Sequence, residues 1–281
     1  MLNIKKHPVQ VFLIASAVAL VSINSAQAHV EVASKLEKPT KLVNAIASNN
    51  RSEANKKRDK YRNPQQTLEF FGFKPNMTVV EITPGGGWYT EILAPALKNT
   101  GKLIGAHYPD TGEDNYYSNS RKRLEKKLAS NDIFSQVVLS DFVPRKASEL
   151  APANTADIVL TFRNLHNWGE EGVEQVFKDA YKALKMGGVL GVVEHRLPAG
   201  ADAEKAGGYV SEEKTIAQAK AAGFMLVASS EINANAKDNA MHPKGVWTLP
   251  PSLALDKKDK DKYLAIGESD RMTLKFAKVA K

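Results

Sequence analysis

The chain has 281 residues, of which 43% are hydrophobic and 25% are charged, and it contains no cysteine. This composition is typical of soluble globular proteins, and it argues against a disordered, collagen-like or multi-span membrane protein. The lack of cysteine excludes disulfide scaffolds, zinc–cysteine sites, iron–sulfur clusters and a lipoprotein anchor. The net charge of +8 comes from short basic blocks without a one-sided stripe or interleaved aromatic residues, so we expect no nucleic-acid partner.

The N-terminus has the pattern of an export signal. Lys5 and Lys6 precede an uncharged apolar stretch, residues 11–23, which an A-x-A cleavage pattern ending at Ala28 follows. That stretch is shorter than the roughly 20 residues that a membrane-spanning helix needs. We therefore predict a cleaved signal peptide at residues 1–28, a periplasmic or secreted bacterial protein, and no stable membrane span after cleavage. An uncleaved membrane anchor is the alternative.

The elements expected after the signal alternate between helices and strands. An N-terminal arm at residues 29–50 ends in a short helix, and the charged, helix-compatible residues 51–62 lead to a helix at 65–71. Strands are predicted at residues 77–82, 102–106, 134–139, 156–162, 189–194, 224–231 and 271–277. Further helices are predicted at residues 88–98, 115–130, 172–184 and 211–222.

Strands that alternate with helices predict an α/β fold, a Rossmann-like three-layer sandwich with a mostly parallel sheet. We expect one domain at residues 51–281. Residues 232–267 form an insertion before the last strand of that domain.

The strongest functional signal lies between Val79 and Thr90. A buried strand carries an acid, Glu81, near its end, and three consecutive glycines, residues 85–87, then turn the chain into a helix. Glycines at such a turn permit positive φ and a close approach of the backbone to a ligand. The spacing differs from the dinucleotide-binding pattern G-x-G-x-x-G, because Thr90 stands at the third glycine position. A purely structural strand–helix turn is the alternative.

Four segments resemble the class I S-adenosylmethionine-dependent methyltransferases, and the resemblance covers residues 56–278. Residues 81–87 look like their motif I, 140–142 like their adenine-binding acid, 157–166 like motif IV, and 184–190 like the turn into strand five. The resemblance implies a seven-stranded sheet with an antiparallel last strand. It also implies S-adenosyl-L-methionine as cofactor and methyl transfer to a small-molecule acceptor, which the sequence does not identify.

Three shorter segments carry a narrower resemblance. Residues 61–64, 84–89 and 162–168 are similar to segments of exported, largely uncharacterised predicted methyltransferases of bacteria.

The resemblance implies a cofactor site at the ends of the first three strands. Its candidate residues are Glu81, Thr83, Pro84, Gly85, Gly86 and Gly87 in the turn, His107, Asp141 and Phe142 after the next two strands, and Tyr61 and Arg62 in an N-terminal lid. In the lid, Arg62 could meet the methionine carboxylate. His107 stands where most members of the family have an acid that holds the ribose. We therefore expect a shifted ribose contact, a weaker cofactor affinity or a different nucleoside-like ligand.

Candidate catalytic residues follow the fourth and fifth strands; they are Arg163, Asn164, His166 and His195. His166 is the preferred general base, because the ordinary imidazole pKa of about 6.5 suits neutral pH. The alternative is that both histidines are hydrogen-bonded loop residues. Arg163 either pairs with an anionic substrate or braces loops. We expect no metal site.

Export raises a difficulty for this function, because S-adenosylmethionine is made in the cytoplasm. A non-catalytic periplasmic protein that binds the cofactor or a nucleoside is one alternative. The others are a hydrolase of nucleoside-like molecules that uses the same pocket, and a membrane-anchored methyltransferase that faces the cytoplasm. The sequence does not indicate the oligomeric state.

Overall fold

The computed structural model describes residues 40–202, 207–255 and 259–280. The predicted signal peptide and the first part of the predicted arm lie outside these residues. Within the described ranges, no helix is both long and apolar enough to cross a membrane.

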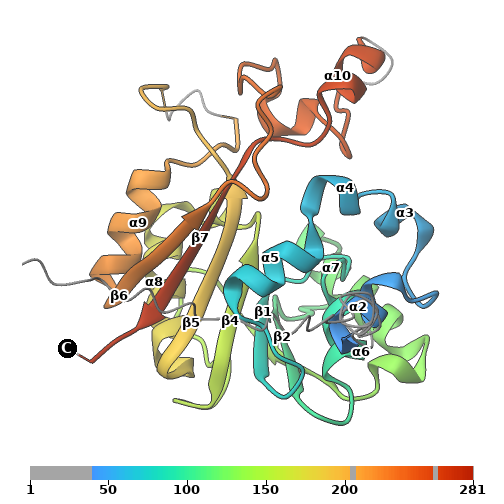
Figure 1. The fold of residues 1–281 in the computed structure, drawn as a ribbon, viewed down its shortest axis with the longest axis vertical. Coiled ribbons are helices and arrows are strands. Elements are labelled where there is room, and N and C mark those ends of the chain that lie inside the picture. The colour runs from blue at the N-terminus through green and yellow to red at the C-terminus, as the bar shows by residue number, and fades with distance from the viewer. Residues whose placement is uncertain (1–39, 203–206, 256–258, 281) are drawn as a thin grey trace, which may run out of the picture. The chain divides into compact units, whose positions relative to one another are not determined.

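A seven-stranded sheet forms the centre of the molecule, with the strand order β3-β2-β1-β4-β5-β7-β6 (Figure 1). The strands are β1 (Thr78–Ile82), β2 (Lys102–His107), β3 (Val137–Asp141), β4 (Ala156–Phe162), β5 (Leu184–His195), β6 (Phe224–Ser230) and β7 (Arg271–Lys278). Strands β1 to β5 pair in parallel, whereas β7 runs antiparallel to both of its neighbours, β5 and β6. This confirms the predicted Rossmann-like α/β fold and its antiparallel last strand.

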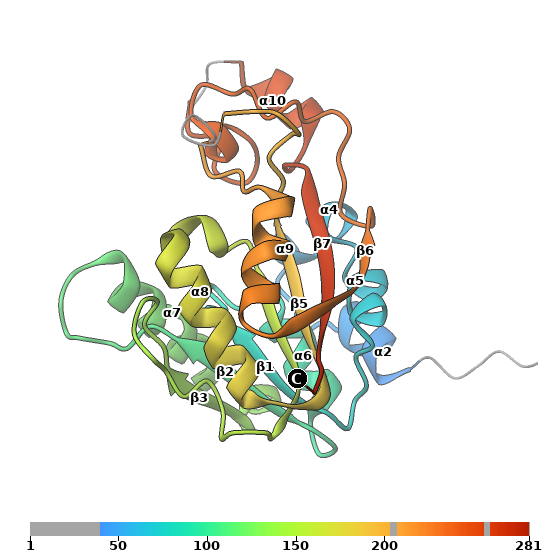
Figure 2. The same cartoon turned by 90° about the vertical axis from the view of Figure 1, so that its left-hand side faces the viewer.

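Helices cover both faces of the sheet (Figure 2). One face packs against α2 (Lys41–Ala47), α5 (Pro64–Phe71) and α6 (Thr90–Leu97), and the other against α8 (Leu165–Ala183) and α9 (Glu212–Ala221). The remaining α-helices are α3 (Glu53–Lys56), α4 (Asp59–Arg62), α7 (Tyr116–Ala129) and α10 (Lys260–Ile266). Successive residues of β1 point to opposite faces, so Val79 and Val80 join different core clusters. The central strands are therefore buried on both sides, as their apolar sequences predict.

Two predicted boundaries are wrong, and a third is confirmed in part. Strand β3 begins at Val137 rather than at residue 134, because Asp132–Phe134 forms a 3-10 turn that the side chain of Asn131 caps. Helix α8 begins at Leu165, well before residue 172, and Gly169 interrupts its helical dihedrals with a φ of 67°. Strand β5 is assigned from Leu184, but its pairing with β4 passes from Leu184 directly to Val189. The glycines therefore lie in an irregular segment, residues 185–188, and regular pairing begins at the predicted residue 189.

The topology places a binding edge at the centre of the sheet. The chain leaves β1 to form β2 on one side and later returns to form β4 on the other. Ligands of open α/β sheets bind beside the carboxyl ends of the strands at such a switch point. The predicted insertion, residues 232–267, contains the 3-10 helix Gly245–Thr248 and α10. Figure 1 shows that α10 and α4 both lie beyond this edge of the sheet.

Candidate active site

The glycine turn forms one wall of a cavity of about 590 Å³ at the carboxyl edge of the sheet. Gly85 has a φ of +58°, which glycine adopts without strain. Gly86 has no such φ, and a Cβ built on it meets no other heavy atom within 4 Å. Nothing within the described protein therefore requires glycine at position 86. Its missing side chain leaves the backbone open to whatever enters the cavity.

Thr83 and Arg163 hold strained backbone conformations at this edge. They follow the neighbouring strands β1 and β4, and their φ angles are 49° and 61°. A non-glycine residue with positive φ costs free energy, and such residues gather at functional sites. Both side chains line the cavity, and within the part of the chain that the structure describes the buried hydroxyl of Thr83 has no hydrogen-bond partner. Asn164 joins the same two strands, because its amide donates to the Ile82 carbonyl at 3.1 Å.

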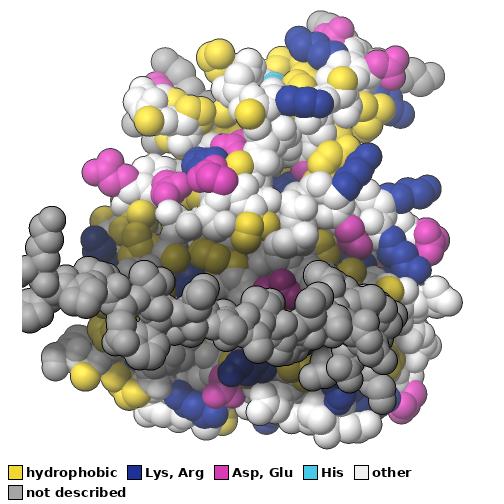
Figure 3. Space-filling view, in the orientation of Figure 1, with side chains coloured by type: hydrophobic (Ala, Val, Ile, Leu, Met, Phe, Trp, Pro, Cys, Tyr) yellow, Lys and Arg dark blue, Asp and Glu magenta, His cyan; other side chains and the backbone are white. Residues whose placement is uncertain are grey.

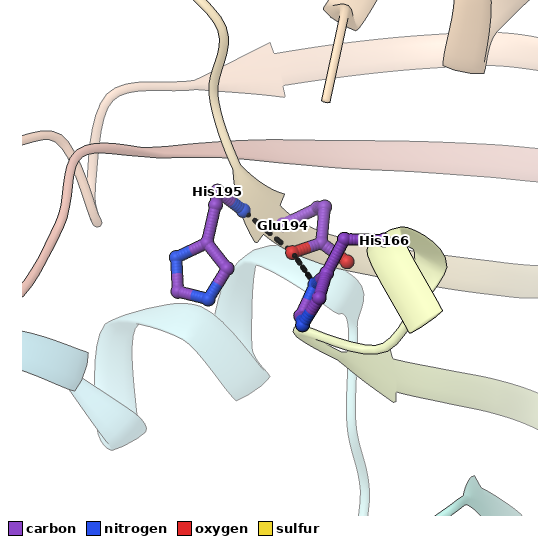
Figure 4. A group of neighbouring side chains, drawn as sticks. All are labelled: His166, Glu194 and His195. Atoms are coloured by element: carbon purple, nitrogen blue, oxygen red, sulfur yellow. Dashed lines mark hydrogen bonds and ion pairs between the residues drawn. The ribbon is translucent and has the colours of Figure 1, made fainter. Parts of the chain in front are cut away.

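A glutamate orients the first of two histidines that line the cavity (Figure 4). The two oxygens of Glu194 accept backbone N–H groups from Leu165 at 2.6 Å and from His195 at 2.8 Å. Oε1 also lies 3.1 Å from Nδ1 of His166. A carboxylate only accepts, so we assign the proton of a neutral His166 to Nδ1, which leaves the lone pair on Nε2. His166 is thereby prepared to act as a base at Nε2.

His195 is held in its neutral form. Burial lowers its pKa well below the ordinary value, and the nearby Arg271, His166 and Arg163 lower it further. Its Nδ1 lies 2.5 Å from the hydroxyl of Ser269.

Four arginines line the same cavity: Arg58, Arg62, Arg163 and Arg271. Three of them share the buried carboxylate of Glu268. Arg58 donates to it at 2.5 Å, Arg62 at 3.4 Å, and Arg271 donates from Nη2. Although burial alone would raise the pKa of Glu268, Arg271, Arg62 and Arg58 hold it well below the ordinary range. Arg271 also donates to the Tyr61 carbonyl at 3.0 Å, which ties the segment around α4 to the sheet.

The structure brings most of the predicted site residues together. Those that line the cavity are Arg62, Thr83, Pro84, Gly85, Gly86, Arg163, Asn164, His166 and His195. Those that do not line it are Tyr61, Glu81, Gly87, His107, Asp141 and Phe142.

Glu81 lies behind the glycine turn. Its carboxyl group is buried and accepts a hydrogen bond of 2.7 Å from the hydroxyl of Thr90, at the start of α6. Burial raises its pKa from the ordinary value of 4.5 to about 7, and the Thr90 hydrogen bond only partly opposes this. In the structure, Glu81 supports the turn from beneath.

The residues expected to hold the ribose and adenine are also absent from the cavity lining. His107 is fully buried between the Tyr108 carbonyl and the Ser120 hydroxyl, each at 3.2 Å. Asp141 is exposed and pairs with Arg121 at 3.0 Å. Tyr108 and Tyr117, whose ring centroids are 4.2 Å apart, line this end of the cavity instead.

Arg271, Arg58 and Trp247 are among the lining residues that sequence reasoning missed. Arg271 is the first residue of β7 and pairs with His195 across the sheet. A strand that runs antiparallel to the rest of the sheet begins at the edge where the parallel strands end. The first residue of the predicted last strand could therefore have been placed at the site from the sequence. Arg58 gave no signal, because its site role depends on contact with the distant Glu268. Trp247 comes from the insertion, and its ring centroid lies 6.0 Å from that of His166.

The side chains of His166, Glu194 and His195 offer ligand atoms that all lie within 4.8 Å of one another. A divalent cation would face the positive charges of Arg163 and Arg271 there, and both Glu194 oxygens already accept backbone N–H groups. We therefore assign no metal to this group.

No protein-family model matches the chain, and no curated protein does either. Solved structures share its fold. A SAM-dependent methyltransferase from Aquifex aeolicus is 16% identical with a TM-score of 0.54, covering 79% of this chain and 93% of its own. Geranyl diphosphate methyltransferase in complex with SAM is 11% identical with a TM-score of 0.53, and the match covers 84% of this chain and 94% of the methyltransferase.

The cyclase SpnF is equally similar, at 14% identity and a TM-score of 0.56, covering 85% of this chain and 93% of its own. At identities this low, the similarity shows that the chain shares its fold with these proteins, and the reaction has to be argued from the site.

Proposed function

We propose that the protein binds S-adenosyl-L-methionine at the glycine turn and transfers its methyl group to a small-molecule acceptor in the cavity. The observation that carries this proposal is the open backbone at Gly86, which faces a cavity at the switch point of the sheet. The fold of the solved methyltransferases supports it.

The side chains around the turn fit the two ends of this cofactor. The guanidinium of Arg62 lies 4.6 Å from the ring centroid of Trp88, the residue directly after the glycines. Its Nη2 has no hydrogen-bond partner in the described ranges. It would hold the methionine carboxylate in a charge-assisted hydrogen bond. Tyr108 and Tyr117 would offer aromatic surface to the nucleobase at the other end. The hydroxyl of Thr83, which also lines the cavity, has no hydrogen-bond partner among the described residues and is a further group that the cofactor would meet.

When bound, S-adenosylmethionine supplies an electrophilic methyl group on its sulfonium. The chain's part is to orient the acceptor and to take a proton from it. His166 takes that proton at Nε2, and Glu194, bonded to Nδ1, stabilises the imidazolium that forms. Neutral His195 stands beside it and can donate or accept a hydrogen bond at Nε2 without adding positive charge.

Calorimetric titration with S-adenosylhomocysteine, the demethylated product, tests the proposal. We expect micromolar binding to the wild-type protein and a loss of about tenfold or more in Gly86→Ala, because the added methyl group would occupy the cavity. Gly187→Ala is the matched control. Gly187 has a φ of +75° and open space around it, and it lies outside the cavity lining. Its replacement should cost stability and leave affinity unchanged. No binding at millimolar ligand would refute the proposal.

Turnover separates an enzyme from a non-catalytic binding protein. A methyltransferase releases S-adenosylhomocysteine only when a methyl acceptor is present. Consumption of the cofactor without any methyl acceptor would indicate a hydrolase. Tight binding without turnover, whichever acceptor is added, would indicate a binding protein.

We also propose that residues 1–28 direct export. Mass spectrometry of the protein from a periplasmic fraction should find His29 at the N-terminus. Precursor mass in the membrane fraction would contradict this and favour the anchored alternative.

A further inference from the structure

The cavity carries charge of one sign. Among the described residues that line it are four arginines and two histidines, and none is an aspartate or a glutamate. The outer face drawn in Figure 3 differs, because basic and acidic side chains are mixed across it. The positive charge is thus gathered inside the cavity.

The neighbouring carboxylates do not neutralise the arginines. Glu268 is shared by three of them, and Glu194 contacts His166, so two carboxylates stand behind four guanidinium groups. The proposed cofactor carries one sulfonium, one ammonium and one carboxylate, and its net charge is therefore positive. Binding it would increase the excess of positive charge. Like charges gathered out of water are costly unless a counter-charge joins them.

Arg163 and Arg271 have donors that the described protein leaves unused. Arg163 is half-buried, and its guanidinium makes no hydrogen bond or ion pair with any described residue. Its withdrawal from water and the neighbouring Arg271 lower its pKa to about 10. Arg271 is 2% exposed, and its Nε has no partner. Both lie near His195, whose pKa they lower, and so beside the proposed base.

We infer that the methyl acceptor carries a carboxylate or phosphate group, bound by Arg163 and Arg271, in addition to the nucleophile from which His166 takes a proton. That the bound anion is the methyl acceptor rests on the proposed function, whereas the anion site itself does not. The insertion places Val246, Trp247 and Pro250 on the cavity lining, so the rest of the acceptor meets an apolar surface. Planar guanidinium groups match the geometry of carboxylates and of phosphates. The two arginines therefore favour a negatively charged group, and binding experiments decide which of the two it is.

Three small probes test the site by calorimetry at constant ionic strength: phenyl phosphate, benzoate and the neutral benzamide. We expect at least one anion to bind about tenfold more tightly than benzamide, both with and without saturating S-adenosylhomocysteine. The tighter anion identifies the group as phosphate or carboxylate. Equal or absent binding of all three would overturn the inference. Anion binding that S-adenosylhomocysteine abolishes would also overturn it, because the arginines would then hold the cofactor's own carboxylate.

Arg163→Asn is the decisive variant, since asparagine tolerates a positive φ and removes the charge. Arg145→Asn is its matched control. Arg145 has a φ of 67°, is exposed and lies outside the cavity lining. We expect Arg163→Asn to weaken the anion about tenfold and Arg145→Asn to leave it unchanged. Equal effects of the two variants would refute the assignment.

The titrations with anions and with S-adenosylhomocysteine test the anion site and the proposed methyl transfer separately. If S-adenosylhomocysteine binds and the anions do not, methyl transfer stands and the oxyanion acceptor falls. If the anions bind and S-adenosylhomocysteine does not, the anion site stands and the methyltransferase proposal falls.

Discussion

Replacing Glu81 by glutamine should stabilise the protein in mildly alkaline solution. Glu81 is 3% exposed, and burial raises the pKa of its carboxyl group from 4.5 to about 7 on folding. A pKa difference of about 2.5 corresponds to about 3 kcal/mol. Glutamine keeps an oxygen that accepts the Thr90 hydroxyl and carries no charge, so it avoids this cost.

The sign of the effect follows from proton binding. Between pH values of about 4.5 and 7, the folded protein keeps the Glu81 proton and the unfolded chain has lost it, so rising pH favours unfolding. Above about pH 7 both states are ionised, and the full cost of burying the charge is present. His195 and His107, whose pKa values are lowered, shift stability in the opposite direction as pH rises through the ordinary histidine range.

Both proteins contain the same histidines, so the contribution of the histidines cancels when the free energies of unfolding of variant and wild type are subtracted. Urea denaturation should therefore find little difference in the free energy of unfolding at about pH 4.5. At about pH 8, Glu81→Gln should be more stable by up to about 3 kcal/mol. A difference that stays constant across this range would refute the reasoning, because Glu81 would then titrate as it does in the unfolded chain.

Three further predictions concern packing, charge and proton position. Gly101→Ala should cost about 3 kcal/mol in urea denaturation, because its Cβ would lie 2.5 Å from the Met77 carbonyl oxygen; a neutral result would contradict the packing. Glu268→Gln should lower the free energy of unfolding by about 4 kcal/mol, because the arginines lose their shared counter-charge. Added sulfate should then raise the stability of the variant more than that of the wild type. An equal increase in both would argue against arginines that lack a counter-charge. Long-range ¹H–¹⁵N NMR should find the His166 proton on Nδ1 in wild type and a shifted tautomer balance in Glu194→Gln. A wild-type proton on Nε2 would contradict the proposed base.

Much of the site could be predicted because local sequence determines it. The glycines at 85–87 follow a strand and open a helix, and Arg163 and His166 follow the next strand of the switch point. These positions require only the strand order and the rule that parallel strands end at one edge. The fold was predictable for the same reason, since apolar strands alternate with helices along the chain.

Side-chain direction was harder to predict. Whether Glu81 faces the cavity or Thr90 depends on how α6 packs against β1, which one sequence does not reveal. The arginines around Glu268 come from both ends of the domain, and their meeting depends on tertiary packing. The start of β3 was misjudged because Phe134 is apolar, although it belongs to a capped turn.

A crystal structure of the protein with S-adenosylhomocysteine would show whether the glycine turn binds the cofactor. We expect the methionine end to lie against Gly85 and Gly86 with its carboxylate on Arg62, and the sulfur to face the part of the cavity that His166 lines. A ligand bound elsewhere, or no ligand at saturating concentration, would contradict it.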